Sequence, residues 1–188
     1  MLLKSETIQN LVNAFAGESQ ARNRYSFYAK AAKEEGYLQI AKIFEETAHN
    51  EHQHAKIFYK FIPPEHYKVC ADFPFFLGKT YDNLIAASDA EHEEWTVIYR
   101  HAADTAKAEG FNDISKAFSL IVDVEKYHQN RFLELAKHVK EKQVFSREHE
   151  TQWICNKCGY HTISKAAPLN CPLCNHDYSH FQLLCDKY

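Results

Sequence analysis

Apolar residues recur every three or four positions through most of the chain, which is the spacing of one face of an α-helix. Residues 5–62 contain two such runs, separated near Gly36, and Pro63 ends the second. A stretch rich in Phe, Pro and Tyr follows at 63–80, and its length predicts a long crossover. Two more helical runs extend to about residue 142. The pattern therefore predicts an all-α bundle of four helices.

Polar residues interrupt the apolar row of every helix. Burying carboxylates without compensating charge costs several kcal/mol each. Arg22 is the only basic residue in the first row, so metal cations are the predicted source of balancing charge. The rows are Ile8, Leu11, Phe15, Glu18, Arg22, Tyr25 and Ala29; Ile40, Phe44, Thr47, Glu51, His54, Phe58 and Phe61; Leu84, Ala87, Glu91 and Glu94; and Ile114, Phe118, Ile121, Glu125, His128, Phe132, Leu135 and Val139.

Two of the rows contain a Glu-x-x-His pair, Glu51 with His54 and Glu125 with His128. Residues three apart lie one above the other on a helix. With one Glu from each of the other two helices, these pairs make the ligand pattern of a di-iron carboxylate bundle. Oxygen and imidazole ligands suit iron or manganese, and the metal between these two stays open.

Two other arrangements of Glu need separate treatment. Glu91 and Glu94 are three residues apart, so both reach the site and supply one carboxylate more than the minimum. Glu46 and His49 form another Glu-x-x-His pair, but it lies five residues before the Glu51 pair, about 140° around the helix. We therefore expect Glu46 and His49 to face solvent.

The two halves of the helical region repeat each other, which makes a two-fold pseudo-symmetric site plausible. From Glu18 to Tyr25 is seven residues, but from Glu91 to Tyr99 is eight. One extra residue in a helix is usually absorbed as a π-bulge, so we predict one between Glu91 and Tyr99. At an offset of 74, residues 33–37 match 107–111, and Tyr25, Phe44, Glu51 and His54 match Tyr99, Phe118, Glu125 and His128.

The inward tyrosines allow two interpretations. Tyr25 and Tyr99 are either plain core aromatics or partners of the site ligands, and the sequence does not separate these. We count both, together with His54 and Glu94, as candidate catalytic residues.

After residue 142 the helical pattern fades, and Gly, Pro, Asn and Cys become frequent. We therefore predict a bundle domain at 1–146 and a separate loop- and β-rich module at 147–188. Trp153, Tyr160 and Phe181 are expected to form the small core of this module.

Four of the six cysteines lie within twenty residues of one another in this module. Two Cys-x-x-Cys pairs separated by twelve residues predict a tetrahedral four-thiolate metal site at Cys155, Cys158, Cys171 and Cys174. The spacing alone fits iron and zinc equally. Iron is favoured because a redox site in the bundle needs an electron supplier and zinc does not change oxidation state. Cys70 and Cys185 have no partner at ligand spacing, so we expect packed or surface thiols there.

Composition narrows the setting. The 188 residues carry a net charge of −3 without a cluster of Lys and Arg, which argues against nucleic-acid binding. Neither a signal peptide nor an apolar run of membrane-spanning length is evident, so no membrane contact is expected and a cytoplasmic location is predicted. The cytoplasm is reducing, which favours metal ligation over disulfides for the cysteines.

At this point the chain resembles the rubrerythrins over essentially its whole length. The resemblance rests on FAGESQARNRY at 15–25, EHEE at 91–94, the two Glu-x-x-His pairs and the two Cys pairs. It implies a ferritin-like four-helix bundle followed by a rubredoxin-like domain. In that domain Gly159 follows the second Cys of the first pair as in the family, but Asn175 stands at the corresponding place. Asn tolerates a left-handed backbone, so the second turn is expected to survive.

The resemblance also implies how the ligands divide. Glu18, Glu51, Glu91 and Glu125 would be carboxylate ligands, and Glu51 and Glu125 would bridge two iron ions that an oxo group also bridges. His128 would bind one iron throughout. The other iron would exchange His54 in the reduced state for Glu94 in the oxidised state.

The implied activity is a peroxidase that reduces hydrogen peroxide to water in oxidative-stress defence. Each iron of the reduced pair would supply one electron while the O–O bond breaks. A third iron, held by the four thiolates, would return electrons received from an external reductase or rubredoxin. The resemblance further implies a head-to-tail homodimer.

Two other functions stay open at this stage. A ferritin-like iron store would use the bundle to oxidise and deposit iron, but it does not need a thiolate-bound iron. A structural scaffold would hold zinc in the cysteine site, and its purified form would be colourless.

Overall fold

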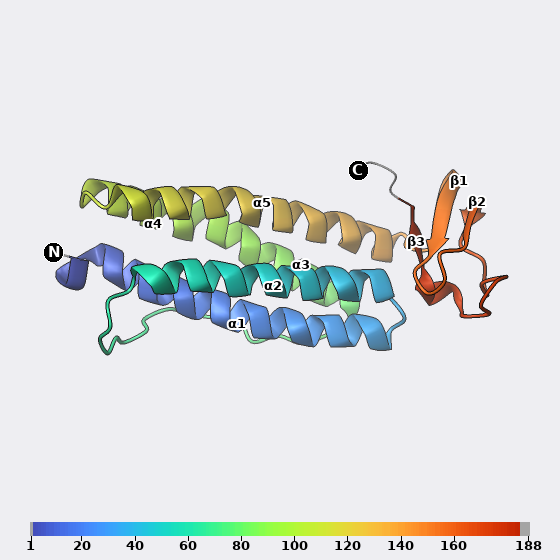
Figure 1. Ribbon diagram of the computed structural model, residues 1–188, viewed down its shortest axis with the longest axis horizontal. Helices are drawn as coiled ribbons and strands as arrows, with labels where there is room; N and C mark the ends of the chain where they lie inside the picture. The colour runs from blue at the N-terminus through green and yellow to red at the C-terminus, as the bar shows by residue number, and fades with distance from the viewer. Residues whose placement is uncertain (1, 185–188) are drawn as a thin grey trace.

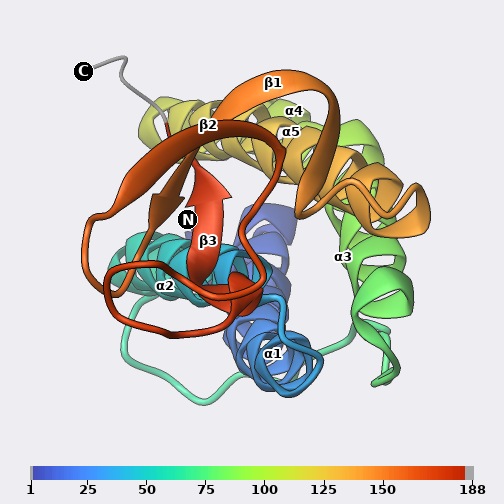
Figure 2. The same ribbon diagram turned by 90° about the vertical axis from the view of Figure 1, so that its right-hand side faces the viewer.

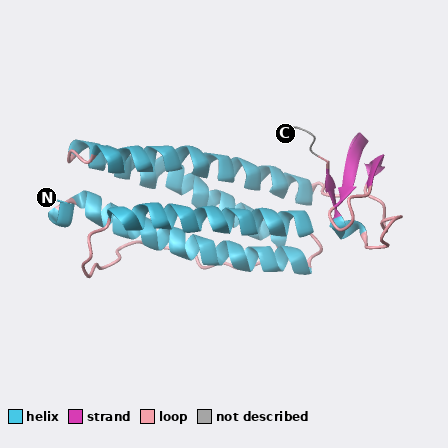
Figure 3. Ribbon diagram, viewed as in Figure 1, coloured by secondary structure: helices cyan, strands magenta, loops and turns pink. Residues whose placement is uncertain are grey.

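The helices form four rods, which lie side by side along the long axis, and a small module with a three-stranded sheet sits at one end (Figure 1). The structure is a computed structural model and describes residues 2–184. The all-α bundle with a small β-containing module is the predicted fold, and it is confirmed (Figure 3). The elements are η1 (Leu2–Lys4), α1 (Glu6–Glu34), α2 (Leu38–Phe61), α3 (Thr80–Glu93), η2 (Glu94–Ile98), α4 (Tyr99–Ala108), α5 (Asn112–Lys140), β1 (Ser146–Cys155), β2 (His161–Ala166), η3 (Tyr178–His180) and β3 (Phe181–Leu183).

The third rod is continuous although it has three parts, because α3, the π-helical segment η2 and α4 follow one another without a break. The pairs α1–α2 and α3/α4–α5 are helical hairpins that pack together as the bundle. No helix within residues 2–184 combines the length and the apolar character that crossing a lipid bilayer requires.

Two hydrophobic clusters fill the bundle, one on each side of a polar layer. The first includes Leu11, Phe58 and Phe118. The second includes Phe44 and Phe132. On every rod the predicted ligands fall between the residues of the two clusters, so apolar side chains keep water away from both sides of the layer.

The two hairpin turns have the same construction, as the internal repeat predicts. Gly36 and Gly110 both take a left-handed backbone, with φ of 83° and 84°. The Glu before each Gly accepts hydrogen bonds from the first turn of the other hairpin. Glu35 Oε1 accepts from the backbone N–H of Thr80 at 2.7 Å. Glu109 Oε2 accepts from the backbone N–H of Thr7 at 2.9 Å. Each turn therefore caps the first helix of the opposite hairpin.

The predicted crossover connects α2 to α3 and runs back along the outer side of α1 (Figure 1). Side chains of α1 bind its backbone at intervals, which fixes its path although it has no regular structure. The hydrogen bonds run from Gln9 Nε2 to Lys68 O (3.0 Å), from Asn13 Nδ2 to Cys70 O (2.9 Å), from Arg24 Nη1 to Pro74 O (3.4 Å) and from Tyr28 Oη to Phe76 O (3.0 Å).

The expectation that Arg22 faces the bundle interior is wrong. Arg22 is exposed, and Arg24 is instead the buried arginine of α1, with 5% of its surface accessible. Arg24 lies about 120° around the helix from Glu18. It is buried because the crossover covers that side of α1, which a helical periodicity does not reveal.

The C-terminal module is an antiparallel sheet with the strand order β2-β1-β3. Its core contains Trp153 and Phe181, neither of them exposed, with Tyr160 packed against them, as predicted. The module lies against the end of the bundle where α1 turns into α2 (Figure 2). There the ring of Phe145 stacks on Tyr37, with 6.1 Å between the ring centroids and an interplanar angle of 2°.

Candidate metal centres

The polar layer of the bundle brings together carboxylates from all four rods. Glu18, Glu51, Glu91 and Glu125 each expose 1% of their surface or less. His54 and His128 join them from α2 and α5. Glu46 and His49 are both exposed, as expected, and play no part in the layer.

The ligand atoms form two groups in which all of them lie within 4.8 Å of one another. Glu51 and Glu125 belong to both groups. The first group is Glu18, Glu51, His54 and Glu125, and the second is Glu51, Glu91, Glu125 and His128. Each group has three carboxylates and one imidazole, related by the pseudo-symmetry of the two hairpins.

The two shared carboxylates reach both histidines with opposite oxygen atoms. Glu125 places Oε1 at 2.9 Å from His54 Nδ1 and Oε2 at 2.8 Å from His128 Nδ1. Glu51 places Oε2 at 3.0 Å from His54 Nδ1 and Oε1 at 3.3 Å from His128 Nδ1. This is the disposition that a carboxylate needs to bridge two adjacent cations.

Without metal, protons must balance the charge of this layer. Burial and the negative charge of Glu125 raise the pKa of Glu18 well above its ordinary value. Burial and the same neighbour raise the pKa of Glu91 to about 8. Burial alone would lower the pKa of His128, but its close contacts with the carboxylates of Glu125, Glu51 and Glu91 outweigh burial and raise the pKa to about 12. The pKa of His54 is also raised, because its contacts with the carboxylates of Glu125, Glu18 and Glu51 outweigh the effect of burial.

Glu125 is the exception in the layer. Burial alone would raise its pKa, but close contacts with the imidazoles of His128 and His54 outweigh burial and lower the pKa to about 2. The layer therefore holds protons at neutral pH in places where a cation would replace them.

Unpartnered atoms test whether cations fit the layer. Among residues 2–184, several buried ligand atoms lack a hydrogen-bond partner although they are fully enclosed. They are Glu18 Oε2, Glu51 Oε1, Glu91 Oε2, both oxygens of Glu125 and His128 Nδ1. Buried polar atoms without partners are costly, and these converge on the two groups. Oxygen-rich sites with one imidazole each suit iron, so the residues present fit an iron pair.

The inward tyrosines bind ligands of the opposite hairpin. Tyr99 Oη donates to Glu18 Oε1 at 2.7 Å, and Tyr25 Oη donates to Glu91 Oε1. Both tyrosines are buried. The sequence left two interpretations of Tyr25 and Tyr99 open. The structure supports the one in which they are hydrogen-bonded partners of the ligands.

The predicted π-bulge is confirmed at η2, between Glu91 and Tyr99. The backbone N–H of Tyr99 donates to the carbonyl of Glu94, five residues earlier. The extra residue keeps Tyr99 equivalent to Tyr25 although Glu91 is equivalent to Glu18. Glu94 opens this segment, is half-buried, and lies outside both ligand groups.

A hydrogen-bonded group beside the ligands, formed by Gln129, Trp95 and His92, was not predicted. Gln129, next to His128, accepts a 2.6 Å hydrogen bond from Trp95 Nε1 and lies 3.1 Å from His92 Nδ1. These contacts join η2 and α3 to α5 directly outside the layer. Only their position beside the ligands could have indicated them from the sequence.

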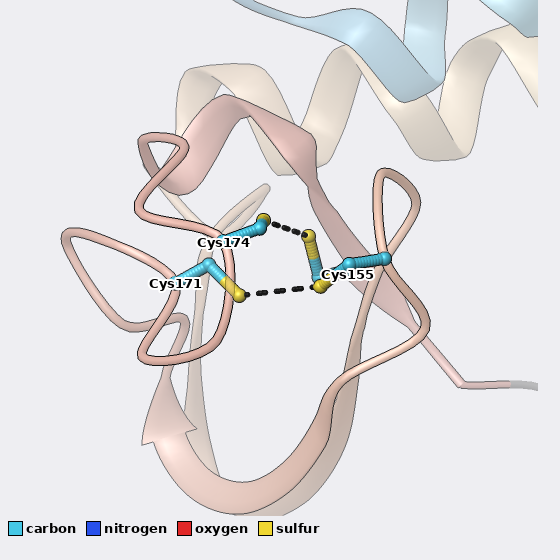
Figure 4. A group of neighbouring side chains, drawn as sticks. Cys155, Cys171 and Cys174 are labelled. Carbon is cyan, nitrogen blue, oxygen red and sulfur yellow. Dashed lines mark hydrogen bonds between the residues drawn. The ribbon is translucent and has the colours of Figure 1, made fainter.

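The second centre is the cysteine cluster of the C-terminal module (Figure 4). All four cysteines are free of disulfides, and their sulfurs converge. Cys155 Sγ lies 3.8 Å from Cys174 Sγ, and Cys158 Sγ lies 3.6 Å from Cys171 Sγ. A tetrahedron with metal–sulfur distances of about 2.3 Å has edges of about 3.8 Å, so the sulfurs already have the spacing of a four-thiolate metal site.

Each Cys pair ends in a left-handed residue, Gly159 with φ of 77° and Asn175 with φ of 58°. The expectation that Asn175 supports its turn is therefore confirmed. Its N–H donates to Cys171 O as the N–H of Gly159 donates to Cys155 O, both at 2.8 Å. Cys70 is exposed on the crossover, as predicted for a surface thiol. Cys185 lies outside the described residues.

The chain matches known proteins along nearly its whole length. Residues 9–136 match the rubrerythrin family, and residues 153–182 match the rubrerythrin rubredoxin-like domain. Rubrerythrin-1 of Clostridium acetobutylicum is 48% identical, over 98% of this chain and 97% of its own. Rubrerythrin of Nitratidesulfovibrio vulgaris is 44% identical, over 96% and 95%.

A solved structure of nigerythrin in a mixed-valence state has a TM-score of 0.65 with this chain. It is 26% identical and covers 98% of this chain and 92% of its own. Together with the geometry, these matches identify the bundle centre as a di-iron site and the cysteine cluster as a rubredoxin-like iron site. The chain belongs to the rubrerythrin family, whose members are iron-containing oxidoreductases.

Proposed function

We propose that this protein is a peroxidase that reduces hydrogen peroxide to water and serves oxidative-stress defence in the cytoplasm. One observation carries the proposal: two ligand groups share Glu51 and Glu125, in the same chain as a four-thiolate iron site. The paired site suits a two-electron reduction, and the single iron suits transfer of one electron at a time.

The ligands in this proposal are the residues that the polar layer gathers. Glu18, Glu51, His54 and Glu125 would hold one iron, and Glu51, Glu91, Glu125 and His128 the other. Cys155, Cys158, Cys171 and Cys174 would hold the third. When bound, the iron pair supplies two electrons for cleavage of the O–O bond.

The protein residues position this chemistry and exclude water. Tyr99 and Tyr25 hold Glu18 and Glu91 in place through their hydroxyls. The hydrophobic clusters shield the layer from water on its two sides along the bundle axis, which strengthens its electrostatic interactions. Glu94 and His54 would exchange at one iron. Glu94 supports this role because it lies at the edge of the layer on the irregular segment η2 rather than inside either group.

We propose that electrons reach the pair from an external reductase or rubredoxin, through the cysteine iron of a second chain in a head-to-tail homodimer. Sixteen residues of α1 separate Glu18 from Glu34 at the end that carries the module. At about 1.5 Å per residue, that is about 24 Å within one chain. Electron transfer weakens steeply with distance, so an antiparallel neighbour would supply a shorter route if its cysteine site lay beside this layer.

Rapid mixing of anaerobically reduced, iron-loaded protein with hydrogen peroxide tests the function. We expect oxidation of the bundle site in milliseconds to seconds and two waters per peroxide. A Cys174→Ser variant should keep this single turnover and lose steady-state turnover with a reductase. Equal steady-state rates in the variant and the unaltered protein would refute the electron relay.

A further inference from the structure

A cavity of about 550 Å³ lies between α1, the α3–η2 region and the crossover. It reaches Glu94 and Tyr99, whose hydroxyl binds Glu18. The cavity therefore ends at the polar layer. A water molecule occupies about 30 Å³ in the liquid, so the space is many times larger than hydrogen peroxide requires.

The crossover spans this cavity where α1 does not bind it. Asn13 fixes Cys70 on one side, and Arg24 fixes Pro74 on the other. Residues 71–73 between these points line the cavity. Phe73 packs against Gly17, where an added Cβ would lie 3.7 Å from its ring. The opening is thus bounded by a segment held at both ends.

Arg24 is the unusual wall residue. Its side chain is 5% exposed and lines the cavity, and Nε and Nη2 have no hydrogen-bond partner within residues 2–184. Its guanidinium lies over the Tyr25 ring, 5.4 Å from the centroid, but within the same stretch of chain no carboxylate pairs with it, and a buried guanidinium without acceptors is costly. The N–H groups on Nε and Nη2 are therefore available to donate to a molecule that enters the cavity.

The charges at the cavity indicate what that acceptor is. Asp72, Asp89 and Glu93 line it and are exposed, so the cavity has an acidic entrance that repels anions. Ala14, Ala86 and Ala90 leave room along the helices. An uncharged molecule with hydrogen-bond-accepting oxygens and a small apolar group fits both features.

We propose that this cavity is the entry path for uncharged hydroperoxides, ROOH, in which R is hydrogen or a small alkyl group, and that Arg24 hydrogen-bonds the incoming molecule. This inference rests on the proposed function and defines its substrate class. The O–O bond breaks, and ROOH with two electrons from the iron pair and two protons from solvent gives ROH and water. The alkyl group occupies the volume that hydrogen peroxide leaves empty.

The test uses iron-loaded protein with hydrogen peroxide and tert-butyl hydroperoxide as substrates. Ala86→Phe narrows the cavity, and Ala108→Phe, at an exposed position on α4 away from it, is the matched control. We expect tert-butyl hydroperoxide to be a substrate of the unaltered protein. Ala86→Phe should lower its kcat/KM more than that of hydrogen peroxide, and Ala108→Phe should change neither. Arg24→Met should raise KM for both by about tenfold.

Charge is tested with peroxymonosulfate, an anionic peroxide. Asp72→Asn with Asp89→Asn should raise the rate of peroxymonosulfate reduction more than the rate of tert-butyl hydroperoxide reduction. Saturation-transfer NMR supplies a readout apart from activity: tert-butyl alcohol should bind the oxidised protein, and Ala86→Phe should abolish the signal. Iron content and Tm show whether each variant is folded.

Two results would overturn the inference: tert-butyl hydroperoxide is not reduced, or Ala86→Phe and Arg24→Met behave like the unaltered protein while hydrogen peroxide is still consumed. Absence of any peroxide reduction would instead contradict the proposed function itself.

Discussion

Tyr99 on α4 donates a 2.7 Å hydrogen bond to Glu18 on α1, and the π-helical segment directly before Tyr99 adds the one residue that makes it equivalent to Tyr25. Tyr25 repeats the contact with Glu91 from the other hairpin. Each hairpin therefore orients a carboxylate of the other. This reciprocity makes the geometry of the layer a property of both hairpins together.

Replacing Tyr99 with Phe removes the donor and leaves Glu18 free to turn. We expect metal affinity or peroxide reduction to fall about 10- to 100-fold, the usual effect of losing a group that orients a metal ligand. Iron titration of the metal-free protein measures this. Tyr28→Phe is the matched control, because its hydroxyl binds Phe76 O on the crossover. Equal losses in both variants would mean that the effect is general destabilisation.

Deleting Val97 should convert η2 into regular helix, since it removes the one extra residue of the repeat. Val97 is 60% exposed, so its loss leaves no hole in the core. We expect an unchanged or higher Tm, because the irregular hydrogen bonds disappear, and slower peroxide reduction, because Glu94 no longer lies at the layer. Val97→Ala should do neither. A deletion variant with full activity would show that the π-helical segment has no role in the reaction.

Metal binding should release protons. At neutral pH the metal-free layer holds protons on Glu91, whose pKa is raised to about 8, and on His128, whose pKa is raised to about 12. Iron must displace them, so the apparent affinity should rise with pH. Calorimetry in buffers of different ionisation enthalpy counts the protons. A binding heat that is the same in all buffers would contradict the prediction.

The metal-free protein should lose stability as the pH rises from about 5 to about 8. Glu91 keeps its proton in the folded state up to about pH 8 but loses it near 4.5 in the unfolded chain, so the folded state binds more protons over this window. The raised pKa of His128 acts in the same direction above about 6.5. Glu125, lowered to about 2, is ionised in both states here and contributes nothing. Urea unfolding at several pH values measures the trend.

The cysteine site should depend on its four thiolates and not on other cysteines. Cys158→Ser should bleach the visible absorption of the thiolate-bound iron while iron remains in the bundle. Cys70→Ser is the matched control, since Cys70 is exposed on the crossover and far along the chain. Visible spectra with metal analysis decide the outcome. A colourless, zinc-containing unaltered protein would contradict the iron assignment.

Glu109→Gln should lower Tm, because it weakens the cap of α1. Hydrogen bonds from Thr7 lower the pKa of Glu109, so its contribution is present above the ordinary carboxyl pKa and is lost as the pH falls below it. Glu35→Gln, the equivalent change in the other turn, should have a comparable effect. Thermal unfolding near pH 7 compares the two variants. Repeating it near pH 3 tests the pH dependence for Glu109→Gln, and a Glu109→Gln difference as large at pH 3 as at pH 7 would contradict the prediction.

The sequence predicted the bundle, the ligand layer and the π-bulge because each leaves a periodic trace. The spacing from Glu18 to Tyr25 is seven residues and that from Glu91 to Tyr99 is eight. This difference was enough to locate η2. The same reasoning failed for Arg22 and Arg24. Helical periodicity describes which side of α1 faces its neighbouring helices, but Arg24 is covered by a segment without periodicity.

Contacts between segments that are far apart in the sequence could likewise not be predicted from helical periodicity. The stacking of Phe145 on Tyr37, which seats the C-terminal module, depends on where a loop meets a turn. The hydrogen bond from Trp95 to Gln129 depends on how η2 and α5 are rotated about their helix axes. Neither leaves a pattern in the spacing of residues.

The exchanged caps at the two turns have a consequence for a divided chain. A peptide ending after α2 would carry Glu35 without the Thr80 amide that it serves, and would begin α1 without Glu109. In a pair of such halves, Glu35 of each copy would accept hydrogen bonds from the first turn of α1 in the other copy, and so cap that helix. The fold is thus built like an assembly of two equivalent pieces that a single polypeptide has made permanent.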